Sequence, residues 1–169
     1  MSLFKASLLA LSLASLSLPS LAAAEANALE KGMAAALQFD PVKEDRGDTG
    51  KAIQAYMKAG VVNKKPDLRI DYDDYYFVNK PSTFLGHELF IIQEEYMTEY
   101  AGCCVDPGAS LIMRLKGKDD ALQAFAKKAV CKVETINMTE KLAYLERKES
   151  VPPGTYVELS CHFNDTKTD

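Results

Sequence analysis

The side chains best suited to acid–base or nucleophilic chemistry are two histidines, His87 and His162, and four cysteines, in a chain of 169 residues. Any mechanism that uses an imidazole must use one of these two histidines. A nucleophilic Cys–His pair needs a free thiol, and an even number of cysteines in an exported chain argues for pairing instead. The sequence contains none of the common nucleotide-binding or hydrolytic motifs. We therefore predict surface or hydrogen-bonded histidines, no catalytic site and no cofactor.

The cysteines fall into an adjacent pair, Cys103-Cys104, and two downstream residues, Cys131 and Cys161. They predict two disulfides. Adjacent cysteines that bond each other close a strained ring, so we predict that one member of the pair bonds Cys131 and the other bonds Cys161. A vicinal disulfide is the alternative. Zinc is disfavoured because the paired C-x-x-C spacing is missing, and a thiol-redox role would require free thiols.

Tyrosines gather beside acidic residues in two stretches, 71–76 and 94–100. Tyrosine gives a large contact area at a low entropic cost and is enriched at protein interfaces. We therefore predict a partner-facing surface that includes Tyr75, Tyr76, Glu95, Tyr96, Tyr100 and Asp106. The alternative is that the tyrosines cap sheet edges while the acids keep them soluble. The aspartates of the first stretch lack the glycine and distal glutamate of a calcium loop, so no metal site is predicted.

The N-terminus has the pattern of a cleaved signal peptide over residues 1–24. Lys5 is followed by an apolar, serine-containing run, then Pro19 and the small residues Ala22–Ala24. The apolar run is too short for a membrane span of roughly 20 residues. Cleavage would leave 145 residues with 19 basic and 24 acidic side chains. These observations predict a soluble periplasmic or secreted protein with no integral membrane span, and the scattered lysines give no basic face for nucleic acid.

The remaining chain predicts one α+β domain, in which an N-terminal helical segment (25–66) precedes a disulfide-tied core (67–169). Apolar periodicity predicts helices over 26–39, 50–59 and 120–129 and a short helix from Thr139, with 41–50 and 61–68 as loops. Strands are expected over 74–78, 84–92, 108–115, 130–136 and 155–163. The predicted fold is a small, mostly antiparallel sheet of four or five strands with helices on one face, an N-terminal helical pair and two disulfides.

Two functional hypotheses follow. The first is an exported protein-binding module, such as an inhibitor, an immunity-type protein or an accessory subunit, whose partner is another exported or periplasmic protein. The second is a small-ligand-binding protein or hydrolase that uses His87 or His162 together with Glu94 or Tyr96. We favour the first, because the clustered tyrosines give a contact surface and nothing in the sequence gives a catalytic group.

Overall fold

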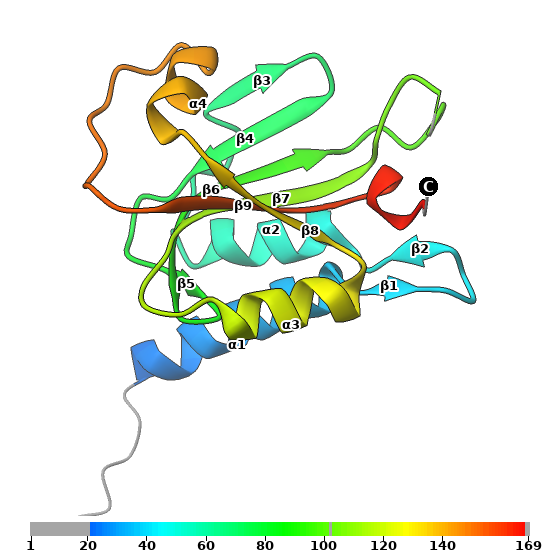
Figure 1. Ribbon diagram of the computed structural model, residues 1–169, viewed down its shortest axis with the longest axis horizontal. Helices are drawn as coiled ribbons and strands as arrows, with labels where there is room; N and C mark the ends of the chain where they lie inside the picture. The colour runs from blue at the N-terminus through cyan, green and yellow to red at the C-terminus, as the bar shows by residue number, and fades with distance from the viewer. Residues whose placement is uncertain (1–20, 102, 168–169) are drawn as a thin grey trace, which may run out of the picture.

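The computed structural model describes residues 21–101 and 103–167, which form an α+β fold around a seven-stranded sheet (Figure 1). The sheet order is β3-β4-β6-β7-β9-β8, with β5 paired to β6, and every pairing is antiparallel. A separate hairpin pairs β1 with β2. The sequence prediction of four or five strands was too low. The strands are β1 (Phe39–Asp40), β2 (Asp45–Arg46), β3 (Leu68–Ile70), β4 (Asp73–Phe77), β5 (Thr83–Phe84), β6 (His87–Glu95), β7 (Gly108–Arg114), β8 (Lys132–Ile136) and β9 (Tyr156–His162).

Three helices cover one face of the sheet, and a fourth lies on the other (Figure 1). The helices are α1 (Leu21–Ala36), α2 (Thr49–Lys58), α3 (Asp120–Ala129) and α4 (Met138–Tyr144), and a short 3-10 turn, η1, spans Asn164–Thr166. The prediction that all helices share one face is therefore wrong. Met138 and Leu142 lie four positions apart in α4 and form an apolar stripe on this helix. The stripe is buried in a second core on the other face of the sheet.

The larger core lies between the sheet and the helices α1, α2 and α3. Alternation along β9 explains which residues enter it, because Val157, Leu159 and Cys161 face these helices while Tyr156 faces α4. The α1–α2–α3 core also includes Met33, Leu37, Ile53, Tyr56, Phe84, Leu111 and Leu122. The second core joins α4 to Tyr75, Ile91, Ile112 and Tyr156.

A bulge in β6 changes the facing of its apolar residues. Leu89 pairs with Met113, but Ile91 pairs with Ile112, so β6 has one residue more than β7 across this step. Simple alternation would place Leu89 and Ile91 on one face. Because of the extra residue, Leu89 joins the larger core and Ile91 the smaller one, which corrects the facing expected from the sequence.

Short strands account for the elements that the sequence analysis missed. β1 begins at the last residue of the helix predicted over 26–39, β2 falls in the loop predicted over 41–50, and β3 begins where another loop was predicted. Strands of two or three residues carry too few positions to show a period of two. The N-cap of α2 is Asp48, whose carboxylate accepts from the Lys51 N–H at 2.7 Å.

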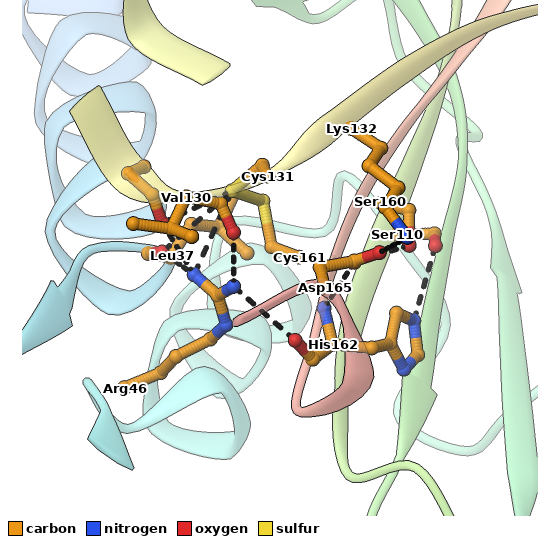
Figure 2. The surroundings of a disulfide bond; sticks show 11 residues. Leu37, Arg46, Ser110, Val130, Cys131, Lys132, Ser160, Cys161, His162 and Asp165 are labelled. Atoms are coloured by element: carbon orange, nitrogen blue, oxygen red, sulfur yellow. Dashed lines mark hydrogen bonds and ion pairs between the residues drawn. A yellow bond between two sulfur atoms is a disulfide. The ribbon is translucent and has the colours of Figure 1, made fainter. Parts of the chain in front are cut away.

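One disulfide is present, and it is not one of the predicted pairs. Cys131 bonds Cys161, with their Cα atoms 4.5 Å apart, and Cys103 and Cys104 are free and exposed. The physical reason is register: Lys132 pairs with Ser160, so the preceding and following residues, Cys131 and Cys161, lie opposite each other (Figure 2). The pairing of Cys103 and Cys104 with the downstream cysteines was wrong.

The predicted signal peptide lies mostly outside the described residues. Residues 1–20 are not described, and α1 begins at Leu21, so the expected cleavage point after Ala24 falls within this helix. Among the described residues, no helix is long and apolar enough to cross a membrane.

Candidate functional site

A cleft of about 610 Å³ opens at one end of the sheet. Four segments that are distant in sequence line it: the β1–β2 hairpin with the start of α2, the end of β6 with the connection that follows, the entry to β7, and the C-terminal turn η1. The lining residues are Phe39, Glu44, Asp45, Arg46, Gly47, Asp48, Thr49, Gly50, Glu94, Glu95, Tyr96, Thr98, Ala101, Pro107, Gly108, Phe163 and Thr166. The volume is within the range of ligand-binding sites, roughly 300–1,000 Å³.

The hairpin wall of the cleft is held close to the end of α1. A Cβ atom at Gly47 would lie 2.7 Å from the Cα of Ala36 and 2.8 Å from the carbonyl oxygen of Ala35. No side chain fits that space, so glycine permits the close approach. Phe39 and Arg46 face each other across the hairpin, and the Arg46 guanidinium lies 5.7 Å from the centre of the Phe39 ring. The hairpin is thus fixed as a wall despite its short strands.

Arg46 fastens this wall to the ends of α1, α3 and β9 (Figure 2). Its Nη1 donates to the carbonyl oxygens of Leu37 and Ala129, each at 2.7 Å, and its Nη2 donates to those of Val130 at 2.6 Å and His162 at 3.2 Å. Burial lowers the pKa of this guanidinium, while Asp165 and Asp106 act in the opposite direction. Both terminal nitrogens are committed to backbone carbonyls, so Arg46 offers little to an anionic ligand.

Carboxylates dominate the charge of the cleft. Five of the lining residues are acidic (Glu44, Asp45, Asp48, Glu94 and Glu95), and Arg46 is the basic residue among them. The Glu94 carboxylate is half-buried and accepts a hydrogen bond from the Thr49 hydroxyl at 2.7 Å. Burial raises the pKa of Glu94, and the neighbouring carboxylates of Asp74 and Asp48 raise it further, against the effect of the Thr49 bond.

Glu94 faces a second carboxylate, that of Asp74 on the neighbouring strand, and an arginine balances the charge of Asp74. Asp74 pairs with Glu94 in register, and it is buried. Arg69 donates two hydrogen bonds to Asp74, from Nε at 2.5 Å and from Nη2 at 2.6 Å. The same guanidinium lies 4.8 Å from the centre of the Tyr96 ring. Arg69 therefore balances Asp74 and holds Tyr96 at the cleft, and Glu94 is left without a cationic partner among the described residues.

The six residues predicted for a partner-facing surface do not share one face. Tyr75 and Tyr76 are both buried, Tyr75 in the α4-side core and Tyr76 in the core under α1, α2 and α3. Alternation along β4 sends these neighbouring rings to opposite sides. Burial raises the pKa of Tyr76 to about 12, and the carboxylates of Asp74 and Glu94 contribute. A docked protein would not reach either ring.

The other four predicted residues lie at or beside the cleft. Tyr96 is 42% exposed and Tyr100 is 75% exposed, and Tyr96 and Glu95 line the cleft. The Glu95 carboxylate accepts from the Asp106 N–H at 2.9 Å, and the Asp106 carboxylate accepts from the Asn164 N–H at 2.6 Å. These bonds tie the end of β6 to the entry of β7 and to η1. Asp106 thus supports the site by two hydrogen bonds that hold these three segments of the chain together.

The free cysteines lie on the same connection between β6 and β7. The N–H groups of Cys103 and Cys104 both donate to the Tyr100 carbonyl oxygen at 3.1 Å, and Ala101 pairs with Val105. The two Sγ atoms are 2.8 Å apart. Beside them is a smaller hollow of about 280 Å³, lined by Glu95, Cys103, Cys104, Val105, Asp106 and Asn164.

Neither histidine lines the cleft, and both are buried. His162 Nδ1 lies 2.6 Å from the Asp106 carbonyl oxygen, which can only accept, so Nδ1 carries a proton. Its Nε2 lies 3.1 Å from Ser110 Oγ and 3.0 Å from Gln93 Oε1. Ser110 is 2% exposed, so this Ser–His contact has no access for a substrate. His87 Nδ1 accepts from the Lys116 N–H at 3.1 Å, far from Glu94 and Tyr96 in the sheet.

The sequence analysis missed the residues that the hairpin contributes, above all Arg46, Asp48 and Thr49. Gly47 was the available signal, since a glycine before a helix cap is typical of a close backbone approach. The described residues contain no group of three or more His, Cys, Asp or Glu side chains that could hold a metal ion. No family model, curated protein or solved structure matches this chain.

Proposed function

We propose that this chain is an exported, soluble protein-binding module that receives a basic, extended segment of a partner protein in the cleft. The observation that carries the proposal is the charge of the cleft: five carboxylates are set against one arginine whose terminal nitrogens already bind four carbonyl oxygens. A lysine or arginine side chain would supply the missing positive charge.

Glu94 is the residue most affected by such a partner. Its carboxylate is half-buried and faces the buried Asp74, so ionisation of Glu94 in the free protein is less favourable than it is in water. A cation placed within about 4 Å would favour the ionised form, and the reduced solvation would make that attraction stronger than at an open surface. The cleft therefore favours cationic over anionic segments.

Exposed aromatic rings supply apolar contact beside these charges. Tyr96 is held by Arg69 at the cleft, and Tyr100 presents most of its ring to solvent. Tyrosine is enriched among the residues that anchor protein interfaces. A bound segment would thus contact carboxylates inside the cleft and tyrosine rings beside it. This arrangement suits a peptide that alternates basic and apolar residues.

A small cationic ligand is the second candidate, because the cleft volume of about 610 Å³ also suits one. The hydrolase alternative has less support: His87 and His162 are buried away from the cleft, and the expected partners Glu94 and Tyr96 are not in contact with them. Export is supported by the signal-peptide pattern of residues 1–24 and is compatible with the Cys131–Cys161 disulfide.

The test is a comparative capture experiment with the immobilised mature chain and a cleft variant, Glu94→Gln/Glu95→Gln. Quantitative mass spectrometry of proteins captured from a periplasmic or secreted extract of the host should identify a partner that the variant loses. Binding should weaken as salt rises, because exposed charges are screened over about 10 Å at 0.1 M ionic strength. A synthetic peptide copied from the partner's basic segment should compete.

The matched control is Glu134→Gln/Glu146→Gln, which removes the same charge from exposed positions outside the cleft. If both variants lose the partner equally, net charge and not the cleft governs binding. If nothing is captured that depends on Glu94 and Glu95, the proposal fails. Binding of lysine or a polyamine to the cleft without any protein partner would favour the small-ligand candidate.

A further inference from the structure

Cys103 and Cys104 form an exposed dithiol, and the chain offers them no other free cysteine to bond. The chain contains four cysteines, and Cys131 and Cys161 are bonded to each other. The remaining two sulfur atoms are 2.8 Å apart, and both residues are exposed. A disulfide bond measures about 2.05 Å, so an approach of about 0.8 Å would convert this contact into a covalent bond.

The backbone around the pair brings the two sulfurs together. Both N–H groups donate to one carbonyl oxygen, that of Tyr100, and the flanking Ala101 and Val105 are paired. Tyr100 has a positive φ of 71°, which turns the chain sharply at this point. The turn is tight, and it presents both thiols beside the hollow of about 280 Å³.

We propose that Cys103 and Cys104 are a redox-active pair that closes reversibly to a vicinal disulfide by exchange with an external disulfide. The inference rests on the contact between the two sulfurs and their exposure, and it does not depend on the docking role of the cleft. It assigns a modification site on the connection between β6 and β7.

The exchange proceeds in two steps that balance. The Cys103 thiolate attacks one sulfur of a small disulfide, a protein–small-molecule disulfide forms, and one small thiolate leaves and takes up a proton. Cys104 then loses its proton and attacks the Cys103 sulfur, which releases the second small thiol and leaves the vicinal disulfide. The protein loses two electrons and two protons, and the external disulfide is reduced to two thiols.

The hydrogen bond between the two thiols indicates the order. It raises the pKa of the Cys104 thiol, which disfavours the Cys104 thiolate, and we therefore assign the first attack to Cys103. The second step is intramolecular, and the neighbouring thiol therefore reacts faster than any second molecule of reagent.

The charge of the hollow selects the class of disulfide. Glu95 and Asp106 line it together with the two cysteines, and Asn164 is the other polar residue there. Two carboxylates beside the thiols repel anionic disulfides and attract cationic ones. A cationic disulfide should therefore react faster than an anionic one, and salt should reduce the difference.

The test uses the full mature chain with its Cys131–Cys161 bond intact and two probes, cystamine as the cationic disulfide and oxidised glutathione as the anionic one. Wild type should release two small thiols per chain and yield the Cys103–Cys104 peptide with the mass of one hydrogen molecule missing. Cys103→Ser and Cys104→Ser should each release one thiol and keep a stable mixed disulfide. Mild dithiol reductant should reopen the vicinal bond before it reduces Cys131–Cys161, because exposed and strained disulfides are the more reducible ones.

The control is Cys103→Ser/Cys104→Ser, which should release no thiol. The proposal is overturned if wild type keeps a stable mixed disulfide as the single variants do, if both cysteines of one chain carry adducts, or if the product is a disulfide-linked dimer. Equal rates for cystamine and oxidised glutathione at low salt would overturn the charge selection while leaving ring closure in place.

Discussion

Removal of the Cys131–Cys161 bond should cost a large share of the stability of this fold. The bond closes a loop with a sequence separation of 30. The chain-entropy relation for such a loop gives about 12 cal/mol/K, or about 3.6 kcal/mol at 25 °C. Cys161 is fully buried, so its replacement by alanine adds the cost of a small cavity, about 1 kcal/mol. We expect Cys131→Ala/Cys161→Ala to lose about 4.5 kcal/mol, which lowers Tm by roughly 15 °C.

Urea unfolding followed by circular dichroism measures this loss, and Cys103→Ala/Cys104→Ala is the matched control. The control removes two exposed sulfurs that constrain no long loop, so its stability should stay within about 0.5 kcal/mol of wild type. If Cys103 and Cys104 instead bonded the downstream cysteines, both double variants would lose the same bonds and be destabilised alike. That outcome, or a loss below about 1.5 kcal/mol in Cys131→Ala/Cys161→Ala, would refute the pairing.

Two further outcomes follow from the cleft. Glu94→Gln should be more stable than wild type at neutral pH. The pKa of Glu94 is raised in the fold, so the protonated carboxyl stabilises the folded state. Wild type loses this stabilisation as pH rises through the pKa of the folded state, whereas the neutral glutamine does not titrate. The gain should vanish near pH 4, where wild-type Glu94 is itself neutral, and a pH-independent difference between the two unfolding curves would contradict the stated burial. Arg46→Ala should lose about 2–3 kcal/mol because four backbone carbonyls lose a charged donor, and Arg46→Lys should recover part of it. Lys43→Ala, whose ion pair with Asp40 is exposed, is the control and should change stability by less than about 0.5 kcal/mol; equal losses in the two alanine variants would count against the clamp.

The longer elements of the fold could be predicted because their patterns are strong. β9 alternates over seven residues, and α3 carries Leu122 and Ala126 at helical spacing, so both elements were recognised close to their observed bounds. The short helix α4 was found as well, but not the face that it covers. A helix's apolar stripe says that it packs against something, and the choice between two faces of a sheet depends on the connections around it.

The site was harder to predict, since its walls come from segments that no local pattern connects. The acidic and aromatic residues at the end of β6, Glu95 and Tyr96, were recognised as candidates from their composition. The hairpin wall, with Arg46 and Asp48, comes from residues about 50 positions earlier that were predicted to be a loop. Tyr75 and Tyr76 were chosen for the same composition, and the sheet buries both. Composition identifies residue types suited to binding, but burial decides which of them a partner can reach.

The register of one edge strand determines the chemistry of all four cysteines. Among the strands of the described residues, β8 pairs with β9 alone, and it is half exposed, so its packing alone specifies the register weakly. In the observed register Cys131 and Cys161 lie opposite each other, and their disulfide fixes this register. A slip by one residue would place Cys131 against Ser160 and leave both sulfurs unpaired. Because this pair is bonded, Cys103 and Cys104 are left free beside the smaller hollow, and the next cysteine along the chain, Cys131, has its partner already. The structural bond and the exposed dithiol are therefore two consequences of the same strand pairing, and a redox role for Cys103 and Cys104 is possible only while that pairing holds.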